Sequence, residues 1–241
     1  MISAYITNLG KYNEGQLCGE YLKFPAEKED VQALLARIGV DGVLYEEVFI
    51  TDYETDIDGL CKYMGEYESV DELNYLAALI KDMDAWDIEK FEASIAHGEH
   101  TSSVKDLINL TQNLDCYHYY PDISDEEDLG RYFIEELSAL EIPEQIEPYF
   151  DYESYGRELY NDSNGIFIKG GGYIESDHSD FIEHYSGRDD LPDEHKIFVY
   201  PPPEKSIQKT LAAYKEMISD TAKDVTAQSL AIGNRPIHES R

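Results

Sequence analysis

The stretch SVDELNYLAALI at residues 69–80 decides how the middle of the chain folds. Its first four residues have the spacing of a helix capping box, in which Ser69 and Glu72 each bind the other's backbone N–H. The apolar residues that follow the box recur at the spacing of one helical face: Leu73, Leu76, Ala77 and Ile80. A second short helix is expected over residues 87–95, and the two helices should form a compact unit that ends near residue 103.

The residues before this helix predict a small sheet packed against one helix. Apolar and polar residues alternate from Ile2 to Thr7, and residues 17–22 can pair back after a turn at 13–15, which predicts a hairpin. Apolar residues at helical spacing between Val31 and Ile38 predict a helix that ends at Gly39. A third strand is expected over residues 48–52.

The residues after the helical unit predict more helices and a second small sheet. We expect a helix over 104–114, a tyrosine-rich strand over 116–120 and a helix opened by a second capping box at Ser124. A turn or short helix should lie between Pro143 and Pro148, and a strand over 166–168.

Beyond three consecutive glycines at 170–172, we expect a C-terminal extension with a strand at 197–200 and a terminal helix. The apolar stripe of that helix comprises Ile207, Leu211, Tyr214, Ile218 and Val225.

These segments together predict an α+β fold: an elongated chain of three small domains followed by an extension. The first domain, residues 1–60, is a small antiparallel sheet plus a helix, and the second, 61–103, is a short helical bundle. The third, 104–175, combines helices with a small sheet. Residues 176–241 form a strand and helix extension to which the sequence assigns no role.

The charge of the chain is its most unusual property. Fifty-one acidic residues oppose 19 basic ones, a formal net charge of −32. So few cations cannot form a surface that grips nucleic acid, and an anionic membrane would repel the protein. The chain has no apolar run of membrane-spanning length and no CxxC pair among its three cysteines. We therefore expect a soluble, cytoplasmic protein that binds neither nucleic acid nor membrane.

Most of the negative charge lies in the first 175 residues, where 39 acidic residues oppose 11 basic ones. Apolar and aromatic residues are interleaved with these acids, which predicts a folded body with a carboxylate-rich face rather than a disordered acidic tail. Duplex DNA carries one charge per about 1.7 Å of axis, so a charge of −28 would match the phosphates of roughly 14 base pairs. The simpler interpretation is an acidic protein whose charge keeps it soluble.

Motifs for catalysis or metal binding are weak throughout the chain. The acidic stretch at 52–59 resembles a calcium loop, but the loop would start at Glu54 and place Gly65 where a bidentate Glu is required. His97 and His100 have metal-like spacing in a segment that looks like a loop, and no GxSxG motif is present. We expect no metal, no cofactor and no enzymatic activity, and a carboxylate-based hydrolase is the least favoured hypothesis.

Four separated segments, in the expected order, resemble the ArdA antirestriction proteins, which are DNA mimics carried on mobile genetic elements. The resemblance extends over about residues 1–175. The segments are TNLGKYNEGQLCGEYLKFP at 7–25, ITDYE at 50–54, RYFIEELSALEIPEQIEPYFDYESYGREL at 131–159 and NGIFI at 164–168.

The resemblance implies three small domains in a curved, elongated chain that forms a homodimer through the third domain. It also implies that the protein acts without cofactor or catalysis. It implies binding to the DNA-binding core of type I restriction–modification enzymes, through their specificity and methyltransferase subunits, so that restriction is inhibited. Whether modification is also inhibited stays open. The alternative is an acidic interaction module that sequesters another DNA-binding protein.

For phosphate mimicry we select acids that we expect on outward faces. They are Asp52, Glu54, Asp56, Asp58, Glu66, Glu68, Asp71, Glu72, Asp82, Asp84, Asp87, Glu89, Asp122, Asp125, Glu126, Glu127, Asp128, Glu135 and Glu136. For self-association the resemblance points to the antirestriction motif at 140–159. Within the motif we select the aromatic residues, because Tyr offers a large amphipathic contact at modest entropic cost: Tyr149, Phe150, Tyr152 and Tyr155. Packing inside the third domain is the alternative for each of these rings. Gly156 is interpreted as a turn residue.

Overall fold

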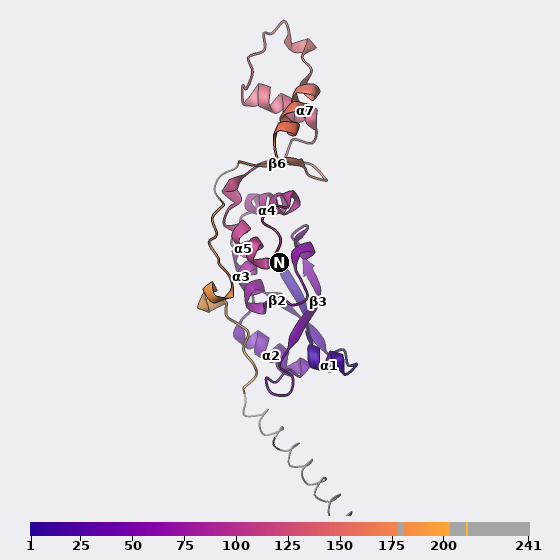
Figure 1. The fold of residues 1–241 in the computed structure, drawn as a ribbon, viewed down its shortest axis with the longest axis vertical. Coiled ribbons are helices and arrows are strands. Elements are labelled where there is room, and N and C mark those ends of the chain that lie inside the picture. The colour runs from indigo at the N-terminus through magenta and orange to yellow at the C-terminus, as the bar shows by residue number, and fades with distance from the viewer. Residues whose placement is uncertain (178–180, 203–210, 212–241) are drawn as a thin grey trace, which may run out of the picture.

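The computed structural model describes residues 1–177, 181–202 and 211, and Figure 1 shows the elements spread along one long axis. The described residues form seven α-helices and two three-stranded antiparallel sheets, which confirms the expected mixture of helices and strands. The first sheet and α2 lie toward one end of the axis, α3, α4 and α5 lie in the middle, and α7 lies at the far end (Figure 1). The division into three domains stays a prediction.

The first sheet has the strand order β2-β1-β3 and is built from β1 (Ile2–Asn8), β2 (Gly19–Phe24) and β3 (Val48–Thr55). β1 and β2 pair as the predicted hairpin. Their connection begins with a short helix, α1 (Leu9–Asn13), whose first turn is capped by the Asn8 side chain accepting from the Lys11 N–H.

α2 (Lys28–Ile38) packs against this sheet through the predicted apolar face. The helix ends at Gly39, as predicted, because Gly39 adopts the left-handed conformation (φ 79°) that stops a helix.

Three helices form the middle of the molecule: α3 (Val70–Lys81), α4 (Ala85–His97) and α5 (Val104–Thr111). A single-turn helix, η1 (Leu60–Tyr63), connects β3 to this group. The first half of the predicted capping box is present, since Ser69 accepts from the Glu72 N–H. One continuous hydrophobic core joins these helices to the first sheet. We call the first sheet and the helices α2, α3, α4 and α5 together the body.

The second sheet, β4 (Tyr117–Tyr120), β6 (Tyr173–Ser176) and β5 (Ile166–Phe167) in the order β4-β6-β5, lies between two cores. Successive side chains of a strand point to opposite faces. Accordingly, Ile174 belongs to the core of the body, whereas Tyr173 belongs to a second, smaller core with Ile123 and Leu129.

Beyond this sheet lies a part that we call the distal unit, residues 121–163. It contains α6 (Glu126–Arg131), a π-helical turn η3 (Tyr132–Glu136), the single turn η4 (Glu147–Tyr149) and α7 (Tyr152–Asp162). The predicted capping box at Ser124 is wrong by one residue. Asp125 caps α6 by accepting from the Asp128 N–H at 3.0 Å, while the Asp128 carboxylate accepts from the Ser124 N–H.

The interpretation of Gly156 as a turn residue is also wrong, because it lies inside α7. Gly156 and Gly130 face each other where α7 crosses α6. A Cβ atom added at Gly156 would collide with the backbone carbonyl oxygen of Glu126. The two helices approach this closely only because both positions lack a side chain.

Residues 181–202 form an extended segment that we call the strap, and it runs back along α5 and α3 toward α2 (Figure 1). It contains two single turns, η5 (Arg188–Asp190) and η6 (Asp193–His195). The strand expected at 197–200 is absent from this described segment. The terminal helix predicted around 207–225 lies outside the described residues, apart from the exposed Leu211. Among the described residues, no helix is long and apolar enough to cross a membrane.

Candidate functional site

The candidate acids lie on the outside of the body and on the part of the distal unit nearest to it. Thirteen of the nineteen are exposed, and five are half-buried. The exposed ones follow β3 and the connection to α3, the turn between α3 and α4, the outer face of α4, and the segment that includes α6 and η3. They are Asp52, Glu54, Asp56, Asp58, Glu66, Asp82, Asp84, Glu89, Asp122, Asp125, Glu127, Glu135 and Glu136.

Few of these carboxylates are neutralised by a nearby cation. Asp56 pairs with the N-terminal amine, and Glu127 and Glu135 share Arg131. Glu72 pairs with Arg188. Within the part of the chain that the structure describes, the other fifteen candidates have no ion-pair partner. Unpaired carboxylates on one elongated body produce a strongly negative surface potential.

Several of the candidates also have local structural roles. Asp84 caps α4 by accepting from the Asp87 N–H at 2.9 Å, and Glu68 accepts from the Gly65 N–H at 3.0 Å. The Tyr21 hydroxyl donates to Asp52 across the sheet, and this hydrogen bond raises the pKa of Tyr21 to about 12. Negative charge is therefore fixed at defined positions along the body.

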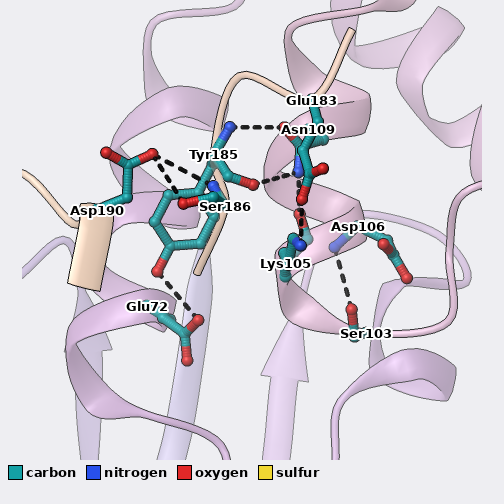
Figure 2. A network of polar contacts seen from close by, with 9 residues as sticks. All are labelled: Glu72, Ser103, Lys105, Asp106, Asn109, Glu183, Tyr185, Ser186 and Asp190. Carbon is teal, nitrogen blue, oxygen red and sulfur yellow. Dashed lines mark hydrogen bonds and ion pairs between the residues drawn. The ribbon is translucent and has the colours of Figure 1, made fainter. Parts of the chain in front are cut away.

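Glu72 does not face outward, so this part of the prediction is wrong. Its residue is only 6% exposed, because the strap covers it. The Tyr185 hydroxyl donates to one carboxylate oxygen at 3.0 Å and the Arg188 Nε–H donates to the other at 2.8 Å. Figure 2 shows the Tyr185 side chain reaching from the strap to Glu72 on α3. The Glu72 carboxylate thus binds the strap instead of completing the capping box.

Asp71 is also occupied by the strap. One carboxylate oxygen accepts the backbone N–H groups of Ile197 and Phe198 at 2.8 and 2.7 Å. The N–H groups of Ile197 and Phe198 therefore bond a side chain of α3 and not the backbone of a neighbouring strand. Asp71 is half-buried as a result. Neither Asp71 nor Glu72 is therefore available as an outward-facing phosphate mimic.

The four aromatic residues of the motif have different surroundings. Tyr149 is 85% exposed, whereas Tyr152 is buried under the Arg131 guanidinium, 4.3 Å from the ring centroid. The Phe150 ring contacts the rings of both Tyr152 and Tyr155, with centroid distances of 5.0 and 5.9 Å. Tyr152 therefore packs inside the distal unit, and Tyr149 is the most accessible of the four.

Three further apolar side chains in the distal unit are exposed. Leu140 and Ile146 belong to the motif at 140–159 but were not singled out within it, and Leu137 was expected to face inward on the helix that follows Ser124, which is wrong. Leu137, Leu140 and Ile146 are each about half exposed. Together with Tyr149 they form the exposed apolar residues of this unit. The segment from 137 to 149 is rich in Pro, Glu and short turns, so its apolar residues show no helical or strand periodicity that would have identified them.

A comparison of the sequence with protein-family models gives one match, to the antirestriction protein family ArdA, over residues 4–175. The chain belongs to the ArdA family. No curated protein sequence matches it. The ArdA match ends within β6, so the strap and everything after it lie outside the family region.

ArdA membership supports an antirestriction function and suggests an interaction with restriction enzymes. ArdA is a family of antirestriction proteins that are generally not catalytic. In the described part of the chain, no group of three or more His, Cys, Asp and Glu residues is arranged to hold a metal ion.

Proposed function

We propose that this ArdA protein is a DNA mimic that occupies the DNA-binding groove of a type I restriction–modification enzyme. The specificity and methyltransferase subunits would be bound, so that restriction is inhibited. The observation that carries this proposal is the set of exposed carboxylates along the body, of which few have a cationic partner.

The physical argument is competition for a cationic groove. A DNA-binding groove attracts phosphates through Lys and Arg side chains and gains affinity as counterions are released. A folded surface of fixed carboxylates offers the same groove negative charge without a nucleic-acid backbone. The charge of −28 over residues 1–175 equals that of roughly 14 base pairs. The elongated arrangement in Figure 1 distributes this charge along an axis, as DNA does.

We also propose that two copies associate through the distal unit. Tyr149, Ile146, Leu140 and Leu137 leave apolar surface exposed on a unit whose own core is small. Burying such side chains against a second copy removes apolar area from water, and Tyr and aliphatic side chains suit the centre of an interface. A dimer would double the length of the acidic surface.

The test is competition between this protein and DNA. A purified type I methyltransferase core is mixed with labelled duplex that carries its recognition site, and the protein is titrated in at two salt concentrations. We expect displacement at near-stoichiometric amounts, weakening as salt rises. The alternative function, sequestration of another DNA-binding protein, would give no displacement here while a different basic protein is bound tightly.

A matched pair of variants separates a positioned array from net charge alone. The first, Glu54→Gln/Glu66→Gln/Asp82→Asn/Glu89→Gln, neutralises four exposed candidates. The control, Glu29→Gln/Asp162→Asn/Asp189→Asn/Glu194→Gln, removes the same charge from exposed acids outside the candidate set. We expect the first variant to compete at least about tenfold more weakly than the control. Equal losses would contradict a positioned array and favour a general effect of acidity.

A further inference from the structure

Two buried asparagines meet the strap: Asn109 lies inside α5, and Asn113 follows directly after the C-terminal end of that helix. Asn109 and Asn113 are each 2% exposed. The Asn109 amide donates to the Tyr185 carbonyl oxygen at 2.9 Å and accepts from the Tyr185 N–H at 2.8 Å. Asn113 makes the same pair of bonds with Ile182, at 2.9 and 2.8 Å. Each asparagine therefore binds both main-chain groups of one strap residue.

This arrangement recognises an extended backbone rather than a particular side chain. A side-chain amide has a donor and an acceptor side by side, as has the backbone of a residue in an extended segment. Because every residue except proline has both groups, an amide at this position accepts almost any sequence. The two asparagines are four residues apart, the first in α5 and the second just after it, and their partners are three residues apart on the strap, in the opposite direction.

Side-chain contacts add specificity to this backbone recognition. The Tyr185 ring is 2% exposed, packs edge-on against Tyr75 of α3 at a centroid distance of 5.7 Å, and ends at the Glu72 carboxylate (Figure 2). Three residues later Arg188 binds the other oxygen of Glu72. One buried carboxylate on α3 thus recognises a Tyr and an Arg together.

Further contacts fix the two ends of the strap against the body. At the start of the strap, the Phe181 ring stacks on His100 with the centroids 3.7 Å apart, and Glu183 forms an ion pair with Lys105. At its far end, Asp71 accepts the two N–H groups of Ile197 and Phe198. The strap contributes no strand and, apart from two single turns, no helix of its own.

We propose that α3 and α5 form a binding groove for an extended peptide and that residues 181–198 of this chain occupy it as an intramolecular ligand. The ligand class is a peptide in extended conformation with a Tyr and, three positions later, an Arg. The groove is built by the family region, whereas its ligand comes from outside that region. The proposal does not depend on what the acidic surface binds.

Hydrogen exchange on the full chain tests the role of the asparagines. In the Asn109→Leu/Asn113→Leu variant, the amides of the strap should exchange rapidly while those of β1 keep their protection. The control is Thr111→Val, because the Thr111 hydroxyl bonds only its own helix, at the Ile108 carbonyl oxygen. Protected strap amides in the double variant would overturn the proposal, and the protection of β1 shows that the variant is folded.

Binding in trans tests whether the strap behaves as a ligand. A fluorescent peptide with the sequence of residues 181–198 is added to the full-length Tyr185→Ala/Arg188→Ala variant, in which the resident strap is weakened and the groove is unchanged. We expect saturable binding, and binding at least about tenfold weaker when the peptide carries the same two substitutions, the loss typical of a charge-assisted hydrogen bond. No saturable binding, or equal binding by the substituted peptide, would show that the strap is simply part of the fold.

Discussion

The body and the distal unit differ in the size of their hydrophobic cores and in the side chains that they expose. In the body, a continuous core from β1 to β6 buries most of the apolar residues, and the surface combines many carboxylates with scattered exposed apolar side chains such as Leu17, Leu44 and Tyr67. In the distal unit, the second core has three buried residues, and four large apolar side chains stay exposed: Leu137, Leu140, Ile146 and Tyr149. The strap adds Tyr185, Leu191 and Ile197 to the large core of the body, whereas the distal unit has only a small core beside its exposed apolar side chains.

The difference indicates what kind of contact each part makes. A rigid surface of like charges attracts an oppositely charged groove over a distance and loses affinity as salt rises. Exposed apolar side chains act only at contact, and their burial depends little on salt. The proposed DNA mimicry and the proposed self-association therefore belong to different parts of the molecule, and each can be changed separately.

The largest effect is expected from Gly156→Ala, which should break the distal unit and leave the body folded. The added methyl group collides with the Glu126 carbonyl oxygen in a helix crossing that has no space for it. We expect a loss on the order of 3 kcal/mol in the stability of this unit. Thermal unfolding followed by hydrogen exchange in α6 and α7 measures it. Glu158→Ala, an exposed change on the same helix, is the control and should have little effect.

A smaller effect is expected on self-association. The variant Ile146→Ser/Tyr149→Ser removes two exposed apolar side chains from the distal unit. We expect the dissociation constant of the dimer to rise at least about tenfold, because truncation of a buried interface aromatic typically costs about 2 kcal/mol. Sedimentation equilibrium measures it. Val43→Ser/Leu44→Ser, an exposed apolar pair in the body, is the control. If both variants dimerise like the parent protein, the interface lies elsewhere.

Added salt should raise the melting temperature of the body by a few degrees more than that of the distal unit. Repulsion among the carboxylates of the body is screened as the Debye length falls from about 8 Å at physiological salt to about 3 Å at 1 M. We expect the melting temperature of the body at neutral pH to rise with added NaCl. The variant with four neutralised acids should respond less. A rise of the same size in that variant would show that salt acts by another route.

The smallest effect is expected at alkaline pH, at the sheet between the two parts. Burial raises the pKa values of Tyr120 and Tyr173 to about 12. A raised folded-state pKa stabilises the fold below the unfolded value, about 10 for Tyr, and this contribution is lost as pH rises toward 12. A tyrosinate absorbance titration should show late-titrating residues, with stability falling over the same interval. Complete titration near pH 10 in the folded protein would contradict it.

Local patterns in the sequence predicted most of the helices and strands correctly. The capping serine and apolar spacing of α3, the stop at Gly39 and the pairing of β1 with β2 depend on residues that are near one another in the chain. The predictions that failed concern residues whose partners are distant. Gly156 was taken as a turn residue because the helix that leaves no space for a side chain there contacts it through Gly130, 26 residues earlier in the chain.

Asn109 and Asn113 were overlooked for the same reason, although two asparagines four residues apart in the predicted helix at 104–114 were a visible signal. Their partners are backbone groups about 70 residues later, and no sequence pattern marks a backbone group.

The sequence by itself thus determined the charge of this protein through its composition, the positions of most elements through short-range patterns, and the family through its match over residues 4–175. The fold alone determined which acids face solvent, because a carboxylate is exposed or buried according to what packs on it. Glu54 and Glu72 have the same side chain, yet Glu54 remains on the surface and Glu72 is covered by Tyr185 and Arg188, more than 100 residues further along the chain. Periodicity describes one turn or one strand, whereas burial depends on the whole chain.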